Sequence, residues 1–374
     1  MESLTCPFGT FKLQRLPLRK NETLRAWDAA DEYLLTYIHE QFGQALPQKP
    51  LIINDSFGAL GVALAASQPV QWNNSWISYI SQYHNAELNG IDSKQIDWLP
   101  STNRPDIAPS AVFMKLPHNT CLLEEQLLVL RELVPEGTTL IAADMAKHIH
   151  TSTLELFEQC FGPTKTSLAK KKARLIFSTV DKALPAVNFN YPRTIDHNGM
   201  KLVNHAGVFS RQKLDIGTRF FLEHLPEALQ DAHIIDLGCG NGALGVHIAM
   251  KNPQAQLTFV DESYMSVQSA QESWTANNLQ GEAEFRANDC LTDFPKDSAD
   301  IIVCNPPFHQ GNTVGDHIAW RMLQQSHEVL RKGGELRIVG NRHLGYHAKL
   351  KRLFGNCQTV ASNNKFVVLS AIKK

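Results

Sequence analysis

The sequence lacks the features that direct a chain into a membrane or out of the cell. Its first residues, MESLTCPFGTFKLQRLPLRK, contain neither the apolar core nor the cleavage-site pattern of a signal peptide. No apolar run approaches the roughly 20 residues that a membrane-spanning helix needs. The seven cysteines form no CxxC pair, so the spacing typical of zinc and redox sites is absent. We therefore expect a cytoplasmic protein with no membrane partner and no bound metal.

The chain also has almost no net charge, since 36 Lys and Arg face 37 Asp and Glu. The C-terminal segment, residues 315–374, differs from this balance. It holds 11 basic residues and three acidic ones, which gives the segment a formal charge of +8. A basic end on a neutral protein indicates contact with a polyanion such as nucleic acid.

Two apolar segments resemble each other. LIINDSFGALGVALA begins at Leu51 and IIDLGCGNGALGVHIA begins at Ile234, and aligning Gly58 with Gly242 matches GALGVALA to GALGVHIA. Further along, DIAPSAVFMKLPHN has the same pattern as DSADIIVCNPPFHQ: a linker, an apolar strand and then a proline. This internal repeat predicts two domains of one fold, residues 1–182 and 195–374. The segment between them, residues 183–194, is rich in Pro and Asn and is predicted to be a linker.

In the second half, short apolar runs alternate with helical patterns. This alternation predicts an α/β fold with a doubly wound, mainly parallel sheet. We expect a hairpin at Asn198-Gly199, a helix through AWRMLQQSHEVLRKGG that glycine stops, and a terminal antiparallel hairpin that turns at Asn363-Asn364. Ligands of such sheets bind at the carboxyl ends of the strands, and Gly238 and Asn305 both follow such ends.

The glycine-rich stretch DLGCGNGALG predicts a tight turn that a ligand can approach closely. With Ala243, its glycines fit the dinucleotide pattern G-x-G-x-x-G/A. They equally fit the G-x-G-x-G loop of S-adenosylmethionine-dependent methyltransferases. Asp261 follows Gly242 by 19 residues and can accept hydrogen bonds from both ribose hydroxyls of either cofactor. The loop alone therefore leaves a nicotinamide-dependent oxidoreductase open.

The tetrapeptide Asn305-Pro306-Pro307-Phe308 favours the methyltransferase. Two prolines fix the backbone in an extended form and donate no hydrogen bond. The Asn305 side-chain oxygen and the Pro306 carbonyl can accept hydrogen bonds from a planar amine, and the Phe308 ring can stack on a flat base. A planar amine is a poor nucleophile, so holding it in line with the methyl group supplies most of the rate.

The sequence resembles the bacterial guanine-N2 ribosomal RNA methyltransferases, and within them the members that act on large-subunit (23S) RNA. The resemblance rests on NPPFHQG, DLGCGNGALG, NHAGVFSRQKLDIGTRFFLEHL, NRHLGYHAKLKRLFGNC and NNKFVVL. It implies tandem class I (Rossmann-like) methyltransferase domains, S-adenosylmethionine as cofactor, and methylation of a guanine N2 amine. The partner would be 23S ribosomal RNA, naked or in an assembling large subunit. Because two tandem domains in one chain lessen the need for a dimer, we expect a monomer.

The resemblance also assigns site residues. The cofactor site would consist of Asp236, Gly238, Gly240, Gly242, Asp261 and Asp289, with Asp261 at the ribose and Asp289 near the adenine amino group. The target guanine would be held by Asn305, Pro306, Pro307 and Phe308. Three alternatives remain open: the same chemistry on 16S RNA, the same chemistry on an adenine or glutamine amine, and a non-catalytic RNA-binding assembly factor.

The first copy departs from this pattern. Ile52, Asn54 and Ser56 stand at the positions of Asp236, Gly238 and Gly240, and Lys115 stands at that of Asn305. A Cβ atom at two loop positions blocks close approach of a ligand. We expect this copy to have kept the fold and lost the cofactor, and either to hold RNA through the run LAKKKARLIF or to serve as a stabilising domain.

Overall fold

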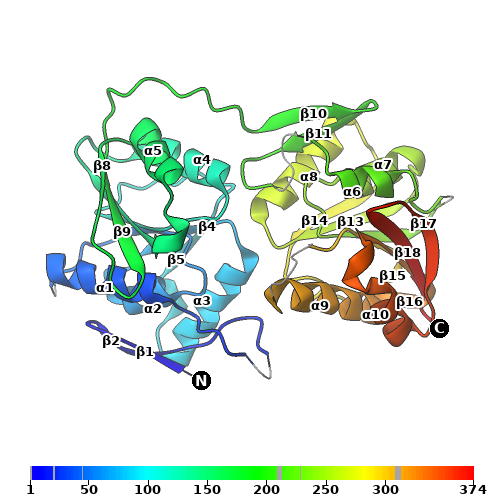
Figure 1. The fold of residues 1–374 in the computed structure, drawn as a ribbon, viewed down its shortest axis with the longest axis horizontal. Coiled ribbons are helices and arrows are strands. Elements are labelled where there is room, and N and C mark those ends of the chain that lie inside the picture. The colour runs from blue at the N-terminus through cyan, green and yellow to red at the C-terminus, as the bar shows by residue number, and fades with distance from the viewer. Residues whose placement is uncertain (1, 20–21, 44, 209–212, 228, 308–312) are drawn as a thin grey trace. The chain divides into compact units, whose positions relative to one another are not determined.

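The computed structural model describes residues 2–19, 22–43, 45–208, 213–227, 229–307 and 313–374. It separates the chain into two compact units, Met1–Phe189 (unit 1) and Asn190–Lys374 (unit 2). In each unit, helices cover both faces of a seven-stranded sheet (Figure 1).

Unit 1 contains these elements in chain order: β1 (Glu2–Cys6), β2 (Gly9–Leu13), α1 (Ala29–Phe42), β3 (Leu51–Ile53), α2 (Ala59–Ala63), η1 (Ala65–Ser67), β4 (Val70–Asn73), α3 (Trp76–Leu88), η2 (Ser93–Gln95), β5 (Asp97–Pro100), β6 (Val112–Lys115), α4 (Thr120–Leu133), β7 (Thr139–Met145), η3 (Ala146–His148), α5 (Thr151–Cys160), β8 (Thr164–Thr166) and β9 (Ala173–Thr179).

Unit 2 contains β10 (Arg193–His197), β11 (Met200–Asn204), α6 (Ile216–Leu222), β12 (His233–Leu237), α7 (Ala243–Lys251), β13 (Gln256–Asp261), α8 (Tyr264–Ala276), β14 (Ala283–Ala287), β15 (Ala299–Cys304), α9 (Thr313–Val329), β16 (Leu330–Asn341), η4 (Arg342–Leu344), α10 (Tyr346–Phe354), β17 (Gln358–Ser362) and β18 (Phe366–Ile372). The strand β10 begins inside the segment predicted as a linker.

The two sheets have the same strand order. It is β5-β4-β3-β6-β7-β9-β8 in unit 1 and β14-β13-β12-β15-β16-β18-β17 in unit 2. The first five strands of each sheet pair in parallel, and the last two are antiparallel. The predicted fold class is therefore confirmed. In unit 2 the order reverses around β12, which has β13 on one side and β15 on the other, and such a reversal opens a crevice at the carboxyl ends of the strands.

The central strand of unit 2 is buried on both faces. Successive side chains of a strand point to opposite faces, and Ile234 packs in the cluster beneath α6, α7 and α8 while Ile235 packs in the cluster beneath α9 and α10. This double burial is why the sequence of β12 is a continuous apolar run rather than an alternating one.

A small hairpin precedes each sheet and is attached in the same way. In unit 2 the turn between β10 and β11 has positive φ at Asn198 (54°) and Gly199 (83°), as an Asn-Gly hairpin requires. The Lys201 backbone N–H donates to Asn277 Oδ1 at 2.9 Å, and Asn277 Nδ2 donates to the Lys201 carbonyl at 2.7 Å. Lys12 and Asn89 make the same two bonds in unit 1, at 2.9 and 2.8 Å. The predicted hairpin and the predicted repeat are both confirmed.

One predicted element ends early. The helix expected to continue to Gly334 stops at Val329, and Leu330 already begins β16. A Cβ atom on Gly334 would lie 2.9 Å from the Asp300 carbonyl oxygen, and Gly333 has a φ of 81°. These glycines are therefore required by close packing and a backbone kink inside a strand, not by the end of a helix.

The described residues lack two kinds of feature. Within that part of the chain, no helix is both long and apolar enough to cross a membrane. The same residues contain no group of three or more His, Cys, Asp or Glu placed to hold a metal ion.

Candidate cofactor and target-base site

The glycine-rich loop joins β12 to α7 with three left-handed residues. Gly238, Gly240 and Gly242 have φ values of 71°, 54° and 80°, a region that L side chains rarely adopt. A Cβ atom on Gly242 would lie 3.0 Å from the Ala270 Cα, so this position also needs glycine for packing. A Cβ atom on Gly240 would meet no protein atom within 4 Å. The backbone of Gly240 thus borders open space, as a loop that a cofactor approaches closely should.

Asp236 anchors this loop from inside the sheet. Its side chain is fully buried, and Oδ2 accepts a hydrogen bond from the Gly245 N–H at 2.9 Å. Burial raises the pKa of Asp236 to about 8, and the charge of Asp261 adds to the rise. Asp236 thus holds the first turn of α7 against the end of β12.

Asp261 ties the loop to the end of β13. Its Oδ2 accepts the Gly240 N–H at 2.9 Å, and its Oδ1 accepts the Ser263 N–H at 2.9 Å. Burial raises the pKa of Asp261 above its usual range, and these backbone donors oppose the rise. The Glu262 N–H and the Ser266 hydroxyl also donate to this carboxylate, so Asp261 fastens the loop to the start of α8.

Asp289 follows β14 and lies beside Asp261, because the Asn288 N–H donates to the Asp261 carbonyl at 2.9 Å. Its carboxylate forms an ion pair with Arg321 of α9. The Arg321 guanidinium also donates to Thr292 Oγ1 at 2.8 Å. Arg321 was not found from the sequence, because no local pattern connects α9 to the loop after β14.

Asn305 follows β15, and its side-chain amide is held on one side only. Its Nδ2 donates to Thr218 Oγ1 at 2.9 Å, while its Oδ1 is buried and has no hydrogen-bond partner among the described residues. Pro306 is buried and Pro307 is half-buried. Phe308, the fourth residue of the predicted motif, lies outside the described residues. The amide is thus fixed in place with an acceptor left over.

The capped start of α6 explains how Thr218 reaches Asn305. Asp215 is the N-cap, and its side chain accepts the Thr218 N–H at 3.1 Å. This bond places Thr218 three residues into the helix, above the end of β15. The spacing of Asp215 and Thr218 was a visible N-cap signal, but the sequence did not reveal which strand the helix covers.

These residues gather at one edge of the sheet. The strands β14, β13, β12 and β15 are consecutive neighbours, and parallel strands bring their carboxyl ends to the same edge. The structure therefore brings together Asp289, Asp261, the glycine loop and Asn305.

The corresponding loop of unit 1 is closed by the chain's own carboxylate. Asp55 stands at the position of Cys239, is 2% exposed, and accepts hydrogen bonds from four backbone N–H groups at the start of α2, at 2.9–3.1 Å. The Gln71 side chain donates a fifth at 2.9 Å. An anion is favoured at a helix N-terminus, and here Asp55 is that anion. The four backbone N–H groups at the start of α2 therefore already have an acceptor within the protein.

The position of unit 1 that corresponds to Asn305 is closed as well. Lys115 Nζ lies 2.8 Å from Asp28 Oδ1 and 3.0 Å from Asp31 Oδ1. Asp28 and Asp31 are the N-cap and third residue of α1, the positions that Asp215 and Thr218 hold in α6. Burial alone would lower the pKa of Lys115, but the two carboxylates raise it overall. Burial raises the pKa of Asp31 to about 7.

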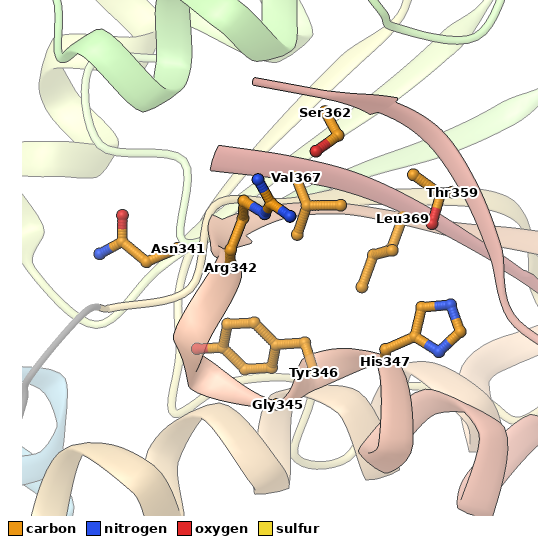
Figure 2. Close-up of a pocket in the computed structure, with 9 residues that line it drawn as sticks. All are labelled: Asn341, Arg342, Gly345, Tyr346, His347, Thr359, Ser362, Val367 and Leu369. Carbon is orange, nitrogen blue, oxygen red and sulfur yellow. The ribbon is translucent and has the colours of Figure 1, made fainter. Parts of the chain in front are cut away.

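A basic groove lies beyond the end of β16 in unit 2. It has a volume of about 200 Å³ and runs between the start of α10 and the strands β17 and β18 (Figure 2). Its lining residues are Asn341, Arg342, Gly345, Tyr346, His347, Thr359, Ser362, Val367 and Leu369. Arg342, Lys351, Arg352 and Lys365 are exposed on this part of the unit and pair with no carboxylate of the described residues.

Comparison with known proteins gives matches over both units. Residues 1–182 match the RLMG N-terminal domain, and residues 199–370 match the methyltransferase small domain. A protein of Ectopseudomonas mendocina named ribosomal RNA large subunit methyltransferase G is 48% identical over 375 residues, which cover 100% of both chains. One of the same name from Streptomyces coelicolor is 44% identical, covering 99% of this chain and 100% of its own.

A solved structure shares the whole fold. It is the T. thermophilus 16S rRNA N2 G1207 methyltransferase in complex with AdoMet and guanosine, with a TM-score of 0.76 and 21% identity. The match covers 100% of this chain and 98% of that one.

Proposed function

Because the chain belongs to the family of ribosomal RNA large subunit methyltransferase G, we propose that it transfers a methyl group from S-adenosylmethionine to the exocyclic N2 amine of a guanine in 23S ribosomal RNA. The family confirms the resemblance found in the sequence. Its members are named for the large subunit, which supports 23S rather than 16S RNA as the substrate. We place the enzyme in the cytoplasm, where ribosomal RNA is found, and propose that it acts as a monomer.

One observation carries the proposal: the half-satisfied amide of Asn305. A buried acceptor without a partner costs about 1–3 kcal/mol of folding free energy. An asparagine at position 305 therefore does not serve the stability of the fold. Thr218 holds the nitrogen of the amide, and the oxygen is left for an incoming donor. A planar amine supplies such a donor, whereas an alkyl or carbonyl group does not.

The described residues can orient the target amine and stabilise the positive charge that develops on its nitrogen. Asn305 Oδ1 would accept one N2–H bond and favour the positive charge that develops on nitrogen. The Pro306 carbonyl would accept the other, and the prolines keep both acceptors still. S-adenosylmethionine would supply a methyl group that is already electrophilic, so the protein needs no activated nucleophile. A guanine in structured RNA must leave its stack to reach this edge.

The loop fits the proposed cofactor at two points. Gly240 leaves open space above its backbone, and the Asp261 carboxylate lies beside it at the end of β13, where we propose that it binds the ribose hydroxyls. We propose that Asp236, Gly238 and Gly242 shape this loop. Asp289 would approach the adenine amino group, with one carboxylate oxygen already paired to Arg321.

We propose that unit 1 binds no cofactor and supports unit 2 or the RNA. Asp55 and Lys115 already occupy the positions that a ligand would need. In the basic run of unit 1, Lys171 pairs with Glu32 at 2.7 Å and Lys170 lies over the Tyr33 ring at 4.8 Å. Calorimetric titration with S-adenosylmethionine should accordingly give one site per chain, and two sites would contradict this assignment.

The decisive experiment maps modified nucleosides in 23S and 16S RNA. Cells with the gene, without it, and with Asn305→Ala are compared by mass spectrometry. We expect one N2-methylguanine to disappear from 23S RNA in both altered strains, while the purified variant still binds S-adenosylmethionine. Unchanged 23S RNA would overturn the proposal. A change in 16S RNA would move the substrate to the small subunit, and no change in either would favour a non-catalytic RNA-binding protein.

A further inference from the structure

We infer that Asn341 reads the target base: its side-chain oxygen accepts the N1–H of the guanine whose N2 amine is held by Asn305. The inference rests on the proposed function and adds to it the residue that selects guanine. An acceptor at Asn305 alone recognises any planar amine, so the motif around it does not fix the base.

The register of two neighbouring strands places the two asparagines close together. In the parallel pair β15–β16, Cys304 lies opposite Ile338. Continuing this register puts Asn305 opposite Val339, two residues before Asn341. With a rise of about 3.3 Å per residue and about 4.8 Å between strands, the two Cα atoms are roughly 8 Å apart. Two side chains at this separation can reach adjacent groups on one base edge.

Both side chains point to the same face of the sheet. Val339 packs in the cluster beneath α6, so Asn341, two residues on, faces the same side. Gly340 between them faces the other side, where a Cβ atom would lie 2.5 Å from the Tyr346 ring. Asn305 also faces α6, because it bonds to Thr218 of that helix.

The start of α6 covers the ends of these strands. Phe366 is the antiparallel partner of Asn341. A Cβ atom on Gly217 would lie 3.1 Å from the Phe366 ring, so the first turn of α6 packs directly on Phe366. The first turn of α6 thus lies above Phe366 and, through Thr218, above Asn305. Asn341 ends the strand between them.

The side-chain amides of Asn305 and Asn341 each have an oxygen that lacks a hydrogen-bond donor among the described residues. Both of these Oδ1 atoms are buried. Figure 2 shows the Asn341 amide directed away from the other residues that line the basic groove. Two unpaired acceptors at adjacent strand ends indicate a ligand that presents two neighbouring donors.

Guanine has this arrangement on its Watson–Crick edge. Its N1–H and N2–H are adjacent donors, whereas N1 of adenine or of 2-aminopurine is an acceptor. An acceptor facing Asn341 Oδ1 would leave two buried lone pairs opposed, and sites of this kind reject such analogues strongly. Asn341 would therefore supply the choice of base, and Asn305 would hold the reacting nitrogen.

The test uses a fragment of the substrate RNA with a single altered target base. The target nucleotide, located by the mapping experiment, carries guanine, 2-aminopurine or 6-thioguanine. The first analogue keeps the N2 amine but loses N1–H and O6. The second keeps N1–H and replaces only O6. Single-turnover methylation rates are measured for the wild type, Asn341→Ala and Asn341→Asp. Gln254→Ala serves as a control, because it deletes an exposed amide before the opposite end of β13.

For the wild type and Gln254→Ala we expect 2-aminopurine to react at least tenfold more slowly than guanine, and 6-thioguanine to react at a similar rate to guanine. Asn341→Ala should react more slowly with guanine by a similar factor but show no further loss with 2-aminopurine. Asn341→Asp keeps an acceptor and should keep the preference for guanine. Calorimetry should give unchanged S-adenosylmethionine affinity for all variants, which shows that each is folded.

A purely structural role of Asn341 predicts a different result, in which the guanine and 2-aminopurine rates fall by the same factor in Asn341→Ala. That outcome, or an unchanged guanine rate, overturns the inference while leaving the proposed function intact. Failure of the wild type to methylate the guanine substrate overturns both.

Discussion

Gly240 allows the proposed cofactor site to be tested separately from the stability of the fold. In Gly240→Ala, the new Cβ atom meets no protein atom within 4 Å, although the residue keeps a φ of 54°. A left-handed conformation costs an L residue about 1–2 kcal/mol. Reduced entropy of the unfolded chain returns about 0.4–1 kcal/mol. The net loss of folding free energy is therefore about 1 kcal/mol, or about 2–4 °C in the melting temperature of a unit of this size.

The effect on ligand binding should be larger than the effect on folding. The methyl group projects into the open space that we propose for the cofactor, so we expect S-adenosylmethionine affinity to fall at least tenfold, equivalent to about 1.4 kcal/mol. Calorimetric titration measures the affinity, and thermal unfolding without ligand measures the stability.

Gly90→Ala is the matched control. Gly90 also has a positive φ, 66°, and open space around its Cβ position, but it lies in unit 1. It should lose similar stability and retain full affinity. If Gly240→Ala binds S-adenosylmethionine as tightly as Gly90→Ala does, the cofactor does not approach this loop, and the assignment of the site is wrong.

Three further predictions concern charged groups. The folded-state pKa of Asp236, about 8, exceeds its unfolded value, so its burial lowers stability as pH rises from about 4 to about 8. The melting temperature of Asp236→Asn relative to wild type should therefore increase from pH 5 to pH 8, and a constant difference would contradict the raised pKa. Lys115→Ala leaves Asp31 buried without its cation, so denaturant titration at pH 8 should show an unfolding free energy lower by about 3 kcal/mol, with a smaller loss at pH 5. An unchanged denaturation midpoint would show that the pair is not buried. Arg342→Glu combined with Lys365→Glu should weaken RNA binding in filter assays and reduce its salt dependence, while S-adenosylmethionine affinity stays unchanged; an unchanged salt slope would place the RNA elsewhere.

Local sequence was sufficient where one segment determines its own structure. The Asn198-Gly199 turn, the apolar run of β12 and the left-handed glycines of the loop follow from backbone preferences within a few residues. The repeat was also visible, because GALGVALA and GALGVHIA still match. In the structure, their first glycines, Gly58 and Gly242, have the same positive φ of 80° at the start of equivalent helices.

Contacts between distant segments were not accessible in this way. The bond of Asn305 to Thr218 joins residues 87 positions apart, and the pair of Asp289 and Arg321 depends on where α9 packs. The role inferred for Asn341 depends on β16 lying beside β15, which the sequence alone did not show. The prediction that Gly334 ends a helix was wrong for the same reason. Glycine is needed at this position because a Cβ atom would collide with the neighbouring strand β15.

The closed site of unit 1 has a consequence for how this protein can evolve. Restoring Asn at Lys115 alone would leave two carboxylates facing each other, and replacing Asp55 alone would strip four amides of their acceptor. Each reversal lowers stability before any ligand can bind and compensate. Any route from this closed loop to one that binds a ligand thus crosses less stable intermediates.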